Sequence, residues 1–158
     1  MAIVQVPAVQ AGGMTLLSTT ALSGTSVTIS GISGSYTNLQ IYIKGLTTTS
    51  NIQPRFRPNG NNPVFTVGEG TGSSKTSDGS FNAGGVGTSL QNYVFTIFNY
   101  ADSTDYKPIN LCGYYVAQTQ GIIGGGASLE TSAITSLVFA TGTAATFTTG
   151  SILIYGVK

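Results

Sequence analysis

Hydrophobic and polar residues alternate in short segments along most of the chain. The clearest segment is "NLQIYIKGL", residues 38–46, which has three aliphatic side chains on one side: Leu39, Ile41 and Ile43. Its other side carries Gln40, Tyr42 and Lys44. In "TSVTISGI", Val27 and Ile29 share a side in the same way. A period of two is typical of a β-strand that buries one face, so both segments are predicted to be strands.

About eight such segments follow one another, with turn-forming residues between them. The others are "MTLLSTTAL", "NIQPRFRPNG", "NYVFTIFNY", "YKPINLCGYYVAQ", "SAITSLVFAT" and "GSILIYGVK". Asn59-Gly60 is a strong signal for one of the turns. Strong helix formers are scarce, whereas Thr, Val, Ile, Tyr and Phe favour strands. The pattern predicts an all-β chain in which residues 14–158 form one antiparallel β-sandwich of about eight strands; a jelly roll is one topology that would fit.

Residues 1–13, "MAIVQVPAVQAGG", are predicted to form an extended N-terminal arm. Pro7 and the Gly12-Gly13 pair oppose a helix. The arm carries four aliphatic side chains, Ile3, Val4, Val6 and Val9. An apolar segment outside a core usually lies on another surface, so we expect these four residues to contact the chain's own domain or a neighbour.

The sequence also predicts two glycine-rich loops and a buried closing strand. Residues 68–89, "GEGTGSSKTSDGSFNAGGVGTS", and residues 119–129 are predicted to be glycine-rich loops, whose function the sequence leaves open. The segment "GSILIYGVK" has apolar residues on both faces. It is therefore predicted to be a core strand with Ile152, Ile154 and Tyr155, together with Leu153 and Val157, largely buried.

Composition excludes several classes of protein. Charged residues make up only 7% of the chain, against about 25% in a typical globular protein, and the net charge is +1. The six Lys and Arg residues are scattered and form no basic block, so nucleic-acid binding is not expected. No apolar run approaches the ~20 residues of a membrane span, and no signal-peptide pattern opens the chain. Binding to a membrane is therefore not expected.

The side chains that enzymes use are few. The chain has no histidine, which excludes His-based nucleophile systems and zinc sites. Ser74 stands before Lys75 where a phosphate-binding loop of the Walker type needs glycine. A glycosidase needs two acids across one sugar, and nothing in the sequence shows that loops bring together any two of the five carboxylates: Glu69, Asp78, Asp102, Asp105 and Glu130. The turn "DSTD", Asp102 to Asp105, could offer oxygen ligands to calcium, but Asp and Ser at a turn usually bond local backbone. We therefore expect no catalytic residue, metal or cofactor, and the turn "DSTD" is expected to bond its own backbone.

Two further groups of residues are candidates for contacts. Arg55 and Arg57 lie two apart, with Phe56 facing the other way. They could bind carboxylates of a partner, or they could protect an edge strand from aggregation together with the neighbouring prolines. Five tyrosines in the later segments could stack on sugars or half-bury at sheet rims: Tyr93, Tyr100, Tyr106, Tyr114 and Tyr115. Cys112, the single cysteine, is predicted to be a small core or interstrand residue.

Residues 15–45, "TLLSTTALSGTSVTISGISGSYTNLQIYIKG", and the closing "GSILIYGVK" resemble virion structural proteins of tailed bacteriophages. Capsid decorations and tail-fibre domains often begin with such Ser/Thr-rich strands. They often finish with a short strand of the form I-x-x-Y-G-(V/I)-K, here Ile152 to Lys158. The resemblance covers about a quarter of the chain and contains no catalytic motif.

The resemblance implies a β-rich protein that assembles symmetrically on a phage particle after synthesis in the host cytoplasm. Because the chain lacks shaft repeats and has an apolar arm, the expected role is a capsid cement or decoration protein that binds the major capsid protein or another virion protein. A homo-oligomer, with the trimer carried over from the family, is expected. The alternative is a tail-fibre or adhesin subunit that binds a host-surface glycan or receptor. A carbohydrate-binding module and a β-sandwich hydrolase also stay open, although the scarcity of catalytic residues disfavours the hydrolase.

Overall fold

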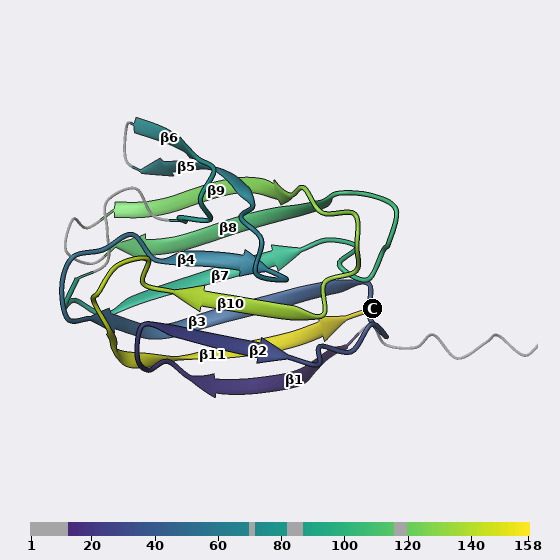
Figure 1. Ribbon diagram of the computed structural model, residues 1–158, viewed down its shortest axis with the longest axis horizontal. Helices are drawn as coiled ribbons and strands as arrows, with labels where there is room; N and C mark the ends of the chain where they lie inside the picture. The colour runs from purple at the N-terminus through teal and green to yellow at the C-terminus, as the bar shows by residue number, and fades with distance from the viewer. Residues whose placement is uncertain (1–12, 70–71, 82–86, 116–119) are drawn as a thin grey trace, which may run out of the picture.

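The computed structural model describes residues 13–69, 72–81, 87–115 and 120–158, which form eleven strands and no helix (Figure 1). The first strands in chain order are β1 (Met14–Ala21), β2 (Ser26–Ser30), β3 (Asn38–Thr48), β4 (Arg55–Pro58), β5 (Val64–Glu69) and β6 (Gly72–Thr76). The later ones are β7 (Gln91–Ile97), β8 (Lys107–Tyr115), β9 (Gln120–Ser128), β10 (Ser136–Ala140) and β11 (Phe147–Val157). In this part of the chain no helix is long and apolar enough to cross a membrane.

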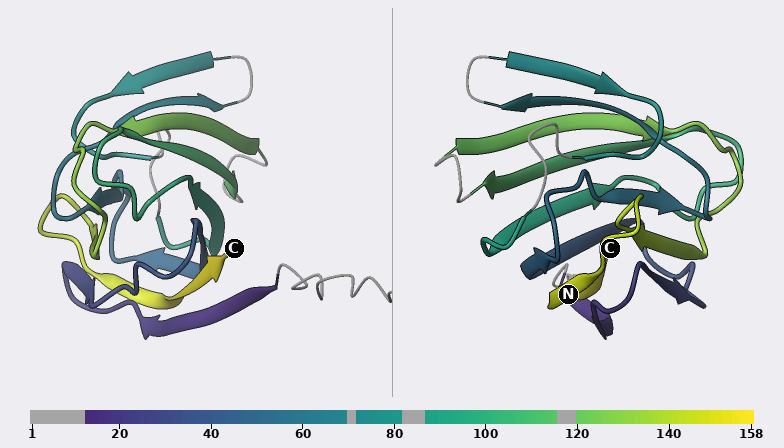
Figure 2. Two further views of the ribbon diagram at one scale, coloured as in Figure 1. Left: turned by 90° about the vertical axis from the view of Figure 1, so that its right-hand side faces the viewer. Right: turned by 60° about the vertical axis from the view of Figure 1, so that its left-hand side comes forward.

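The strands form two antiparallel sheets that pack face to face. The larger sheet has the order β1-β11-β3-β7-β8-β9-β5-β6, and the smaller has the order β2-β10-β4. Figure 1 shows β2, β10 and β4 lying over one face of the larger sheet, and Figure 2 shows that the larger sheet curves around them. The predicted all-β antiparallel sandwich is confirmed. The jelly-roll topology is not confirmed by this strand order, which divides the strands eight and three.

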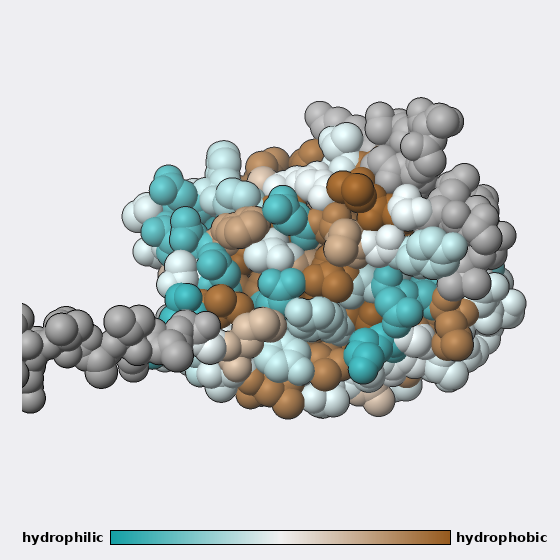
Figure 3. Space-filling model, turned by 180° about the vertical axis from the view of Figure 1, so that it is seen from behind, coloured by the Kyte–Doolittle hydropathy of each residue, from teal (hydrophilic) through white to brown (hydrophobic). Residues whose placement is uncertain are grey.

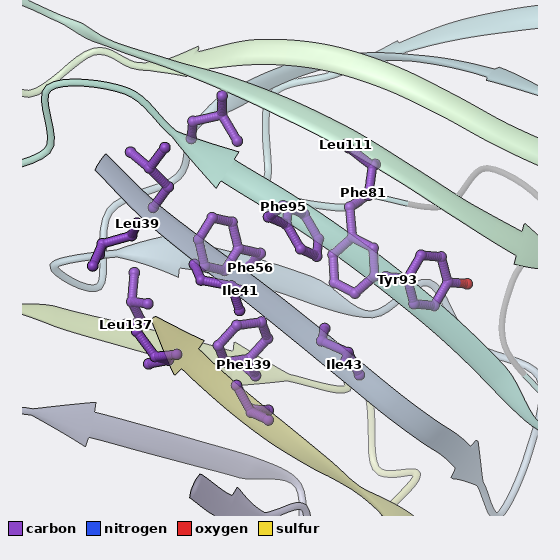
Figure 4. Close-up of a cluster of buried hydrophobic side chains, with 14 of the residues drawn as sticks. Leu39, Ile41, Ile43, Phe56, Phe81, Tyr93, Phe95, Leu111, Leu137 and Phe139 are labelled. Carbon is purple, nitrogen blue, oxygen red and sulfur yellow. The ribbon is translucent and has the colours of Figure 1, made fainter. Parts of the chain in front are cut away.

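An aromatic core fills the space between the two sheets (Figure 4). Phe56 of β4 lies at its centre, with ring centroids 4.8 Å from Phe95 of β7 and 5.0 Å from Phe139 of β10. Phe81 adds edge-to-face contacts with Phe95 and Tyr93, each at 5.0 Å. The alternation predicted in β3 is confirmed, since Leu39, Ile41 and Ile43 are all buried against this core. Val27 and Ile29 of β2 likewise share the inward side.

The two glycine-rich segments predicted as loops contain strands. Most of 119–129 is β9, which pairs with both β8 and β5. A Cβ atom on Gly126 would lie 1.9 Å from the carbonyl oxygen of Val64, and one on Gly124 would lie 2.9 Å from that of Thr66. Glycine is therefore needed because β5 approaches β9 so closely. In the other segment, β5 and β6 form an antiparallel hairpin over 64–76, which corrects part of the loop predicted at 68–89.

β4 is an edge strand whose edge is covered. The Phe56 amide donates a hydrogen bond to the Gly79 carbonyl at 2.8 Å, and the Phe81 amide donates to the Pro54 carbonyl at 3.2 Å. Residues 79–81 thus occupy the side of β4 that β10 leaves free. After β4 the chain turns at Asn59-Gly60, where both residues have positive φ, as the sequence pair predicts.

The segment "GSILIYGVK" lies in β11, which pairs with β1 on one side and β3 on the other. Ile152 and Ile154 are fully buried, as predicted. The prediction is wrong for Leu153, Tyr155 and Val157, which are only partly buried. These three side chains lie on the face of the larger sheet that points away from the smaller sheet, so β11 is covered on one face and not on both.

Candidate binding surface

The interface residues predicted from the sequence fall into two groups. Ile3, Val4, Val6 and Val9 lie outside the described residues. Arg55 and Arg57 do share a face of β4, opposite the buried Phe56. Each has a partner in its own chain: Arg55 forms an ion pair with Asp78 at 3.0 Å, and the Arg57 Nε donates to the Asn62 Oδ1 at 2.6 Å. Both side chains are partly buried, so the pair is bound within its own domain and is not presented as an open carboxylate clamp.

Two of the carboxylates, Asp78 and Asp102, bond to groups nearby in their own chain. Asp102 Oδ1 accepts hydrogen bonds from the Thr104 amide at 2.6 Å, the Thr104 hydroxyl at 2.8 Å and the Asp105 amide at 2.8 Å, which closes the "DSTD" turn on its own backbone as predicted. The hydrogen bonds from the Thr104 and Asp105 amides hold the pKa of Asp102 below its usual value. Within the described residues, no three His, Cys, Asp or Glu side chains lie close enough together to hold a metal ion.

The tyrosines and the cysteine separate into buried and exposed residues. Tyr93 and Tyr100 are buried in the core, whereas Tyr106 and Tyr114 are about half exposed, at 58% and 48%. The Tyr115 side chain lies outside the described set. Cys112 is exposed, so it is not a core residue and holds the interstrand position that was the other predicted possibility. Cys112 is the register partner of Val94 on β7 and of Ile123 on β9, and it lies on the outward side of β8. Its neighbour Leu111 points the other way and is buried in the core.

A row of apolar side chains lies on the outer face of the larger sheet. Direct register partners across five adjacent strands form it: Leu153 pairs with Tyr42, Tyr42 with Val94, Val94 with Cys112, and Cys112 with Ile123. We call these five residues the outer row. Ile123 is 74% exposed, and the other aliphatic members are partly exposed. Figure 3, which views the molecule from this side, shows hydrophobic side chains near the middle of the face among polar ones.

Polar side chains border the outer row on both sides. On one side, Gln40 pairs with Thr96 and Thr96 with Asn110, and the Thr96 hydroxyl donates to the Gln40 Oε1 at 3.2 Å. On the other side, Asn92 pairs with Tyr114. The row is therefore an apolar strip about five strands wide within a polar surface, an arrangement typical of an interaction site.

A second apolar group adjoins the row at the β1 edge of the sheet. Met14 pairs with Val157 and Leu16 with Tyr155, and we call these four residues the outer corner. Met14 and Leu16 are 46% and 51% exposed. The Tyr155 ring contacts Tyr42 of the outer row edge to face, with centroids 5.7 Å apart. The corner and the row thus form one continuous apolar surface.

The outer face is also hollowed where the row meets the polar border. The hollow has a volume of about 340 Å³ and is lined by Tyr42, Lys44, Asn92, Val94, Leu153 and Tyr155, together with backbone at Ile43 and Tyr93, whose side chains point into the core. Asn92 Oδ1 accepts a hydrogen bond from the Gly45 amide at 2.9 Å, which orients the amide group. Lys44 is exposed, and no carboxylate is among the lining residues. The hollow therefore presents to a ligand the rings of Tyr42 and Tyr155, the amide of Asn92 and the ammonium of Lys44.

Sequence reasoning missed this surface because it depends on strand register. Alternation in residues 38–46 placed Tyr42 on the polar side of its strand, but nothing in the sequence paired Tyr42 with Val94 or Leu153. The available signal was that "NYVFTIFNY" and "GSILIYGVK" are apolar on both faces. Apolar residues on the second face were interpreted as core, whereas the structure leaves them partly exposed.

Comparison with known proteins identifies no relative. No family model matches the chain, and neither the curated proteins nor the solved structures contain a match.

Proposed function

We propose that the chain is a non-enzymatic structural protein of a tailed-phage virion, most specifically a capsid cement or decoration protein that acts as a symmetric homo-oligomer. The observation that carries the proposal is the continuous apolar surface formed by the outer row and the outer corner. Such a surface on a small protein with few charges is typical of a protein–protein contact. In the proposed role it is covered by a neighbouring subunit or by the major capsid protein.

The placement of the segments that carry the phage resemblance supports the proposal. Residues 15–45 contain most of β1, all of β2 and most of β3, and the closing segment forms most of β11, which lies between β1 and β3 in the larger sheet. Gly156 of the closing segment lies under the ring of Tyr36, because a Cβ atom there would be 2.4 Å from the ring. The two resembling segments therefore form one structural unit that includes the outer corner.

The inventory of side chains supports a role without catalysis. The chain has no histidine. Among the described acids, Asp78 pairs with Arg55 and Asp102 closes its own turn. Neither is free to act as an acid or base toward a substrate in this arrangement.

Co-sedimentation with empty capsids of the phage that encodes the chain tests the proposal. We expect the native chain to bind at a fixed number of copies per capsid and to raise the temperature at which the capsid breaks down. A variant with Ile123→Asp and Leu153→Asp should lose binding, since both changes place charge in the apolar contact. A matched variant, Thr66→Asp, adds one charge beside the row and should bind. Failure of the native chain to bind capsids at any concentration would contradict the cement role.

The hollow favours the alternative function, a tail-fibre or adhesin subunit that binds a glycan. Tyr42 and Tyr155 provide the aromatic surface on which a sugar ring can stack, and Lys44 and Asn92 provide donors for its hydroxyl or carboxylate groups. Binding to host cells together with glycan-array signals that are lost in Tyr42→Ala would favour this function. Capsid binding without any glycan signal would favour the cement role.

A further inference from the structure

We propose that the outer row of one copy binds residues 1–12 of the N-terminal arm of a second copy, so that exchanged arms link the subunits of the oligomer. The inference deepens the proposed function, because it names the partner of the outer row and rests on the chain acting as an oligomer. Four properties of the chain lead to it: length, chemistry, backbone hydrogen bonding and direction.

The length of the arm matches the width of the row. The outer row runs over β11, β3, β7, β8 and β9, which is four inter-strand spacings of about 4.8 Å, or about 19 Å. The apolar part of the arm runs from Ile3 to Val9, which is six residue steps of about 3.3 Å, or about 20 Å when extended. One arm can therefore cross the whole row without leaving part of it exposed.

The chemistry of the two segments is complementary. Residues 2–12 contain no charged side chain, and four of them are Ile or Val. The outer row consists of three aliphatic side chains, one tyrosine and one cysteine, also without charge. Burying both together removes apolar surface from water on each side and leaves no ion without a partner.

The backbone of the arm favours docking on a face over extending the edge of a sheet. Pro7 lacks an amide hydrogen and stands in the middle of the apolar part of the arm. A strand added to the free edge of β1 would lose a ladder hydrogen bond there. Side-chain contact with the outer row requires no continuous ladder, so proline at this position is tolerated.

The direction of β1 indicates that the arm docked on an outer row comes from a second copy of the chain. Met14 pairs with Val157, whereas the outer row crosses β11 at Leu153, opposite Thr19 and five residues further along β1. The chain therefore enters β1 from the end of the sheet that is away from the row, near the C-terminus (Figure 1). A chain that continues the line of β1 leads away from its own row and toward a neighbour. Docking on its own row would require a full reversal at Gly12-Gly13.

Cys112 makes the proposal directly testable, because the single thiol lies within the outer row and is exposed. One chain carries Val6→Cys with Cys112→Ser, so that its only thiol is in the arm. It is mixed with the native chain, whose only thiol is Cys112, and treated with a short bis-maleimide. We expect a covalent heterodimer that is lost when either thiol is absent. The matched control replaces Val6→Cys by Ser103→Cys, an exposed loop position, and should give only background dimer.

Three results would overturn the proposal. One is a mixture that gives no more dimer than the Ser103→Cys control at concentrations where the chain is oligomeric. Another is a Val6→Cys chain with Cys112 retained that gives only internally linked monomer, because the arm then docks on its own row. The third is a native chain cross-linked through Cys112 to Cys112, because two outer faces then pack directly on each other.

A labelling experiment provides a second readout that does not depend on an engineered thiol. In the native oligomer, Cys112 should react with a mono-maleimide more slowly than in diluted monomer. Val4→Asp with Val6→Asp should restore the fast rate without changing the melting temperature of the diluted monomer. No capsid is present in either experiment. If the arm and Cys112 cross-link but the chain binds no capsid, the cement role is rejected and the arm exchange is kept. If the chain binds capsids but the arm and Cys112 do not cross-link, the arm exchange alone is rejected.

Discussion

The ammonium group of Lys107 donates a hydrogen bond to the backbone carbonyl of Thr131 at 2.5 Å, although the two residues are 24 positions apart. The same group donates to the carbonyls of Asp105 at 2.6 Å and Glu130 at 3.4 Å. Lys107 is fully buried, and none of these three acceptors is a side-chain carboxylate. Backbone carbonyls therefore solvate this cation, and it ties the start of β8 to the segment after β9.

Replacing Lys107 by methionine should destabilise the fold strongly. Methionine fills a similar volume but donates no hydrogen bond, so the three carbonyls lose their charged donor, and we expect a loss of about 1–3 kcal/mol in the free energy of unfolding. Urea denaturation followed by circular dichroism measures the loss. The control is Lys44→Met, at an exposed position on the outer face, which should change stability by less than about 0.5 kcal/mol. Equal stability of the two variants would contradict the role assigned to Lys107.

Asn59 connects the turn after β4 to the start of β10. Its Oδ1 accepts hydrogen bonds from the Thr135 and Ser136 amides at 2.9 and 3.2 Å, and its Nδ2 donates to the Ala133 carbonyl at 3.0 Å. Asn59→Gly keeps the positive φ but removes these bonds, so we expect a loss of about 1–3 kcal/mol in denaturant titrations. Asn61→Gly, two residues on and exposed, is the matched control. A drop of the same size in both variants would show that the turn and not the side chain determines the loss.

The sequence predicted the fold class well because period-two patterning reports local burial directly. β3 and β2 followed from their own alternation, and the turn at Asn59-Gly60 followed from the preference of that pair for positive φ. β5, β6 and β9 were missed because glycine usually indicates a loop. At Gly124 and Gly126 glycine instead reflects the close approach of β5, which is a long-range property.

The candidate surface was less predictable than the fold. Lysine is usually exposed, so nothing local distinguished the buried Lys107 from the exposed Lys44. Arg55 and Arg57 were correctly placed on one face, but their partners Asp78 and Asn62 depend on turns that no periodicity describes. The sequence left Cys112 between a core and an interstrand position, because the residues around it are apolar on both faces of β8.

Gly156 of the closing segment should tolerate no side chain. A Cβ atom there would lie 2.4 Å from the Tyr36 ring, so Gly156→Ala must displace the ring, and we expect a loss of about 1–3 kcal/mol from overpacking. Gly121→Ala is the control, since no atom lies within 4 Å of a Cβ atom there. In the double variant with Tyr36→Ala, Gly156→Ala should have a much smaller effect. Additive losses in the double-mutant cycle would contradict a direct contact.

Stability should decrease in acid partly through Asp78. Burial alone would raise the pKa of Asp78, but hydrogen bonds from Ser80 and the charge of Arg55 hold it below its ordinary value of 3.8. A carboxylate with a lowered pKa stabilises the folded chain above its unfolded pKa of about 3.9 and loses that contribution as the pH falls through the folded value. The contribution should therefore be present at neutral pH and disappear below about pH 4.

The ion pair between Arg55 and Asp78 limits the size of this effect. The two side chains are 30% and 45% exposed, so water screens the pair, and it should contribute less than about 1 kcal/mol. Asp78→Asn should reduce the difference in unfolding free energy between neutral and acid pH by that amount. Arg55→Gln should reduce the same pH-dependent difference in unfolding free energy by a smaller amount, because it removes only the contribution of the Arg55 charge. An unchanged pH profile in Asp78→Asn would show that other acids cause the acid sensitivity.

Adjacent residues of β11 should affect different properties, because they point to opposite faces of the larger sheet. Ile152 is fully buried in the core, so Ile152→Ala should cost about 2–5 kcal/mol of stability. Leu153 is partly exposed in the outer row, and Leu153→Ala should cost about 1 kcal/mol or less, since little of the contact lies within the monomer.

Measuring both stability and assembly separates the two positions. Melting and denaturant titration of the monomer should show the large loss only for Ile152→Ala. Light scattering across a concentration series should show weaker self-association for Leu153→Ala, although its monomer is nearly as stable as the native chain. If Leu153→Ala assembles normally, the outer row is not the contact between subunits. If instead it destabilises the monomer as much as Ile152→Ala, the outer face is part of the core and carries no binding site.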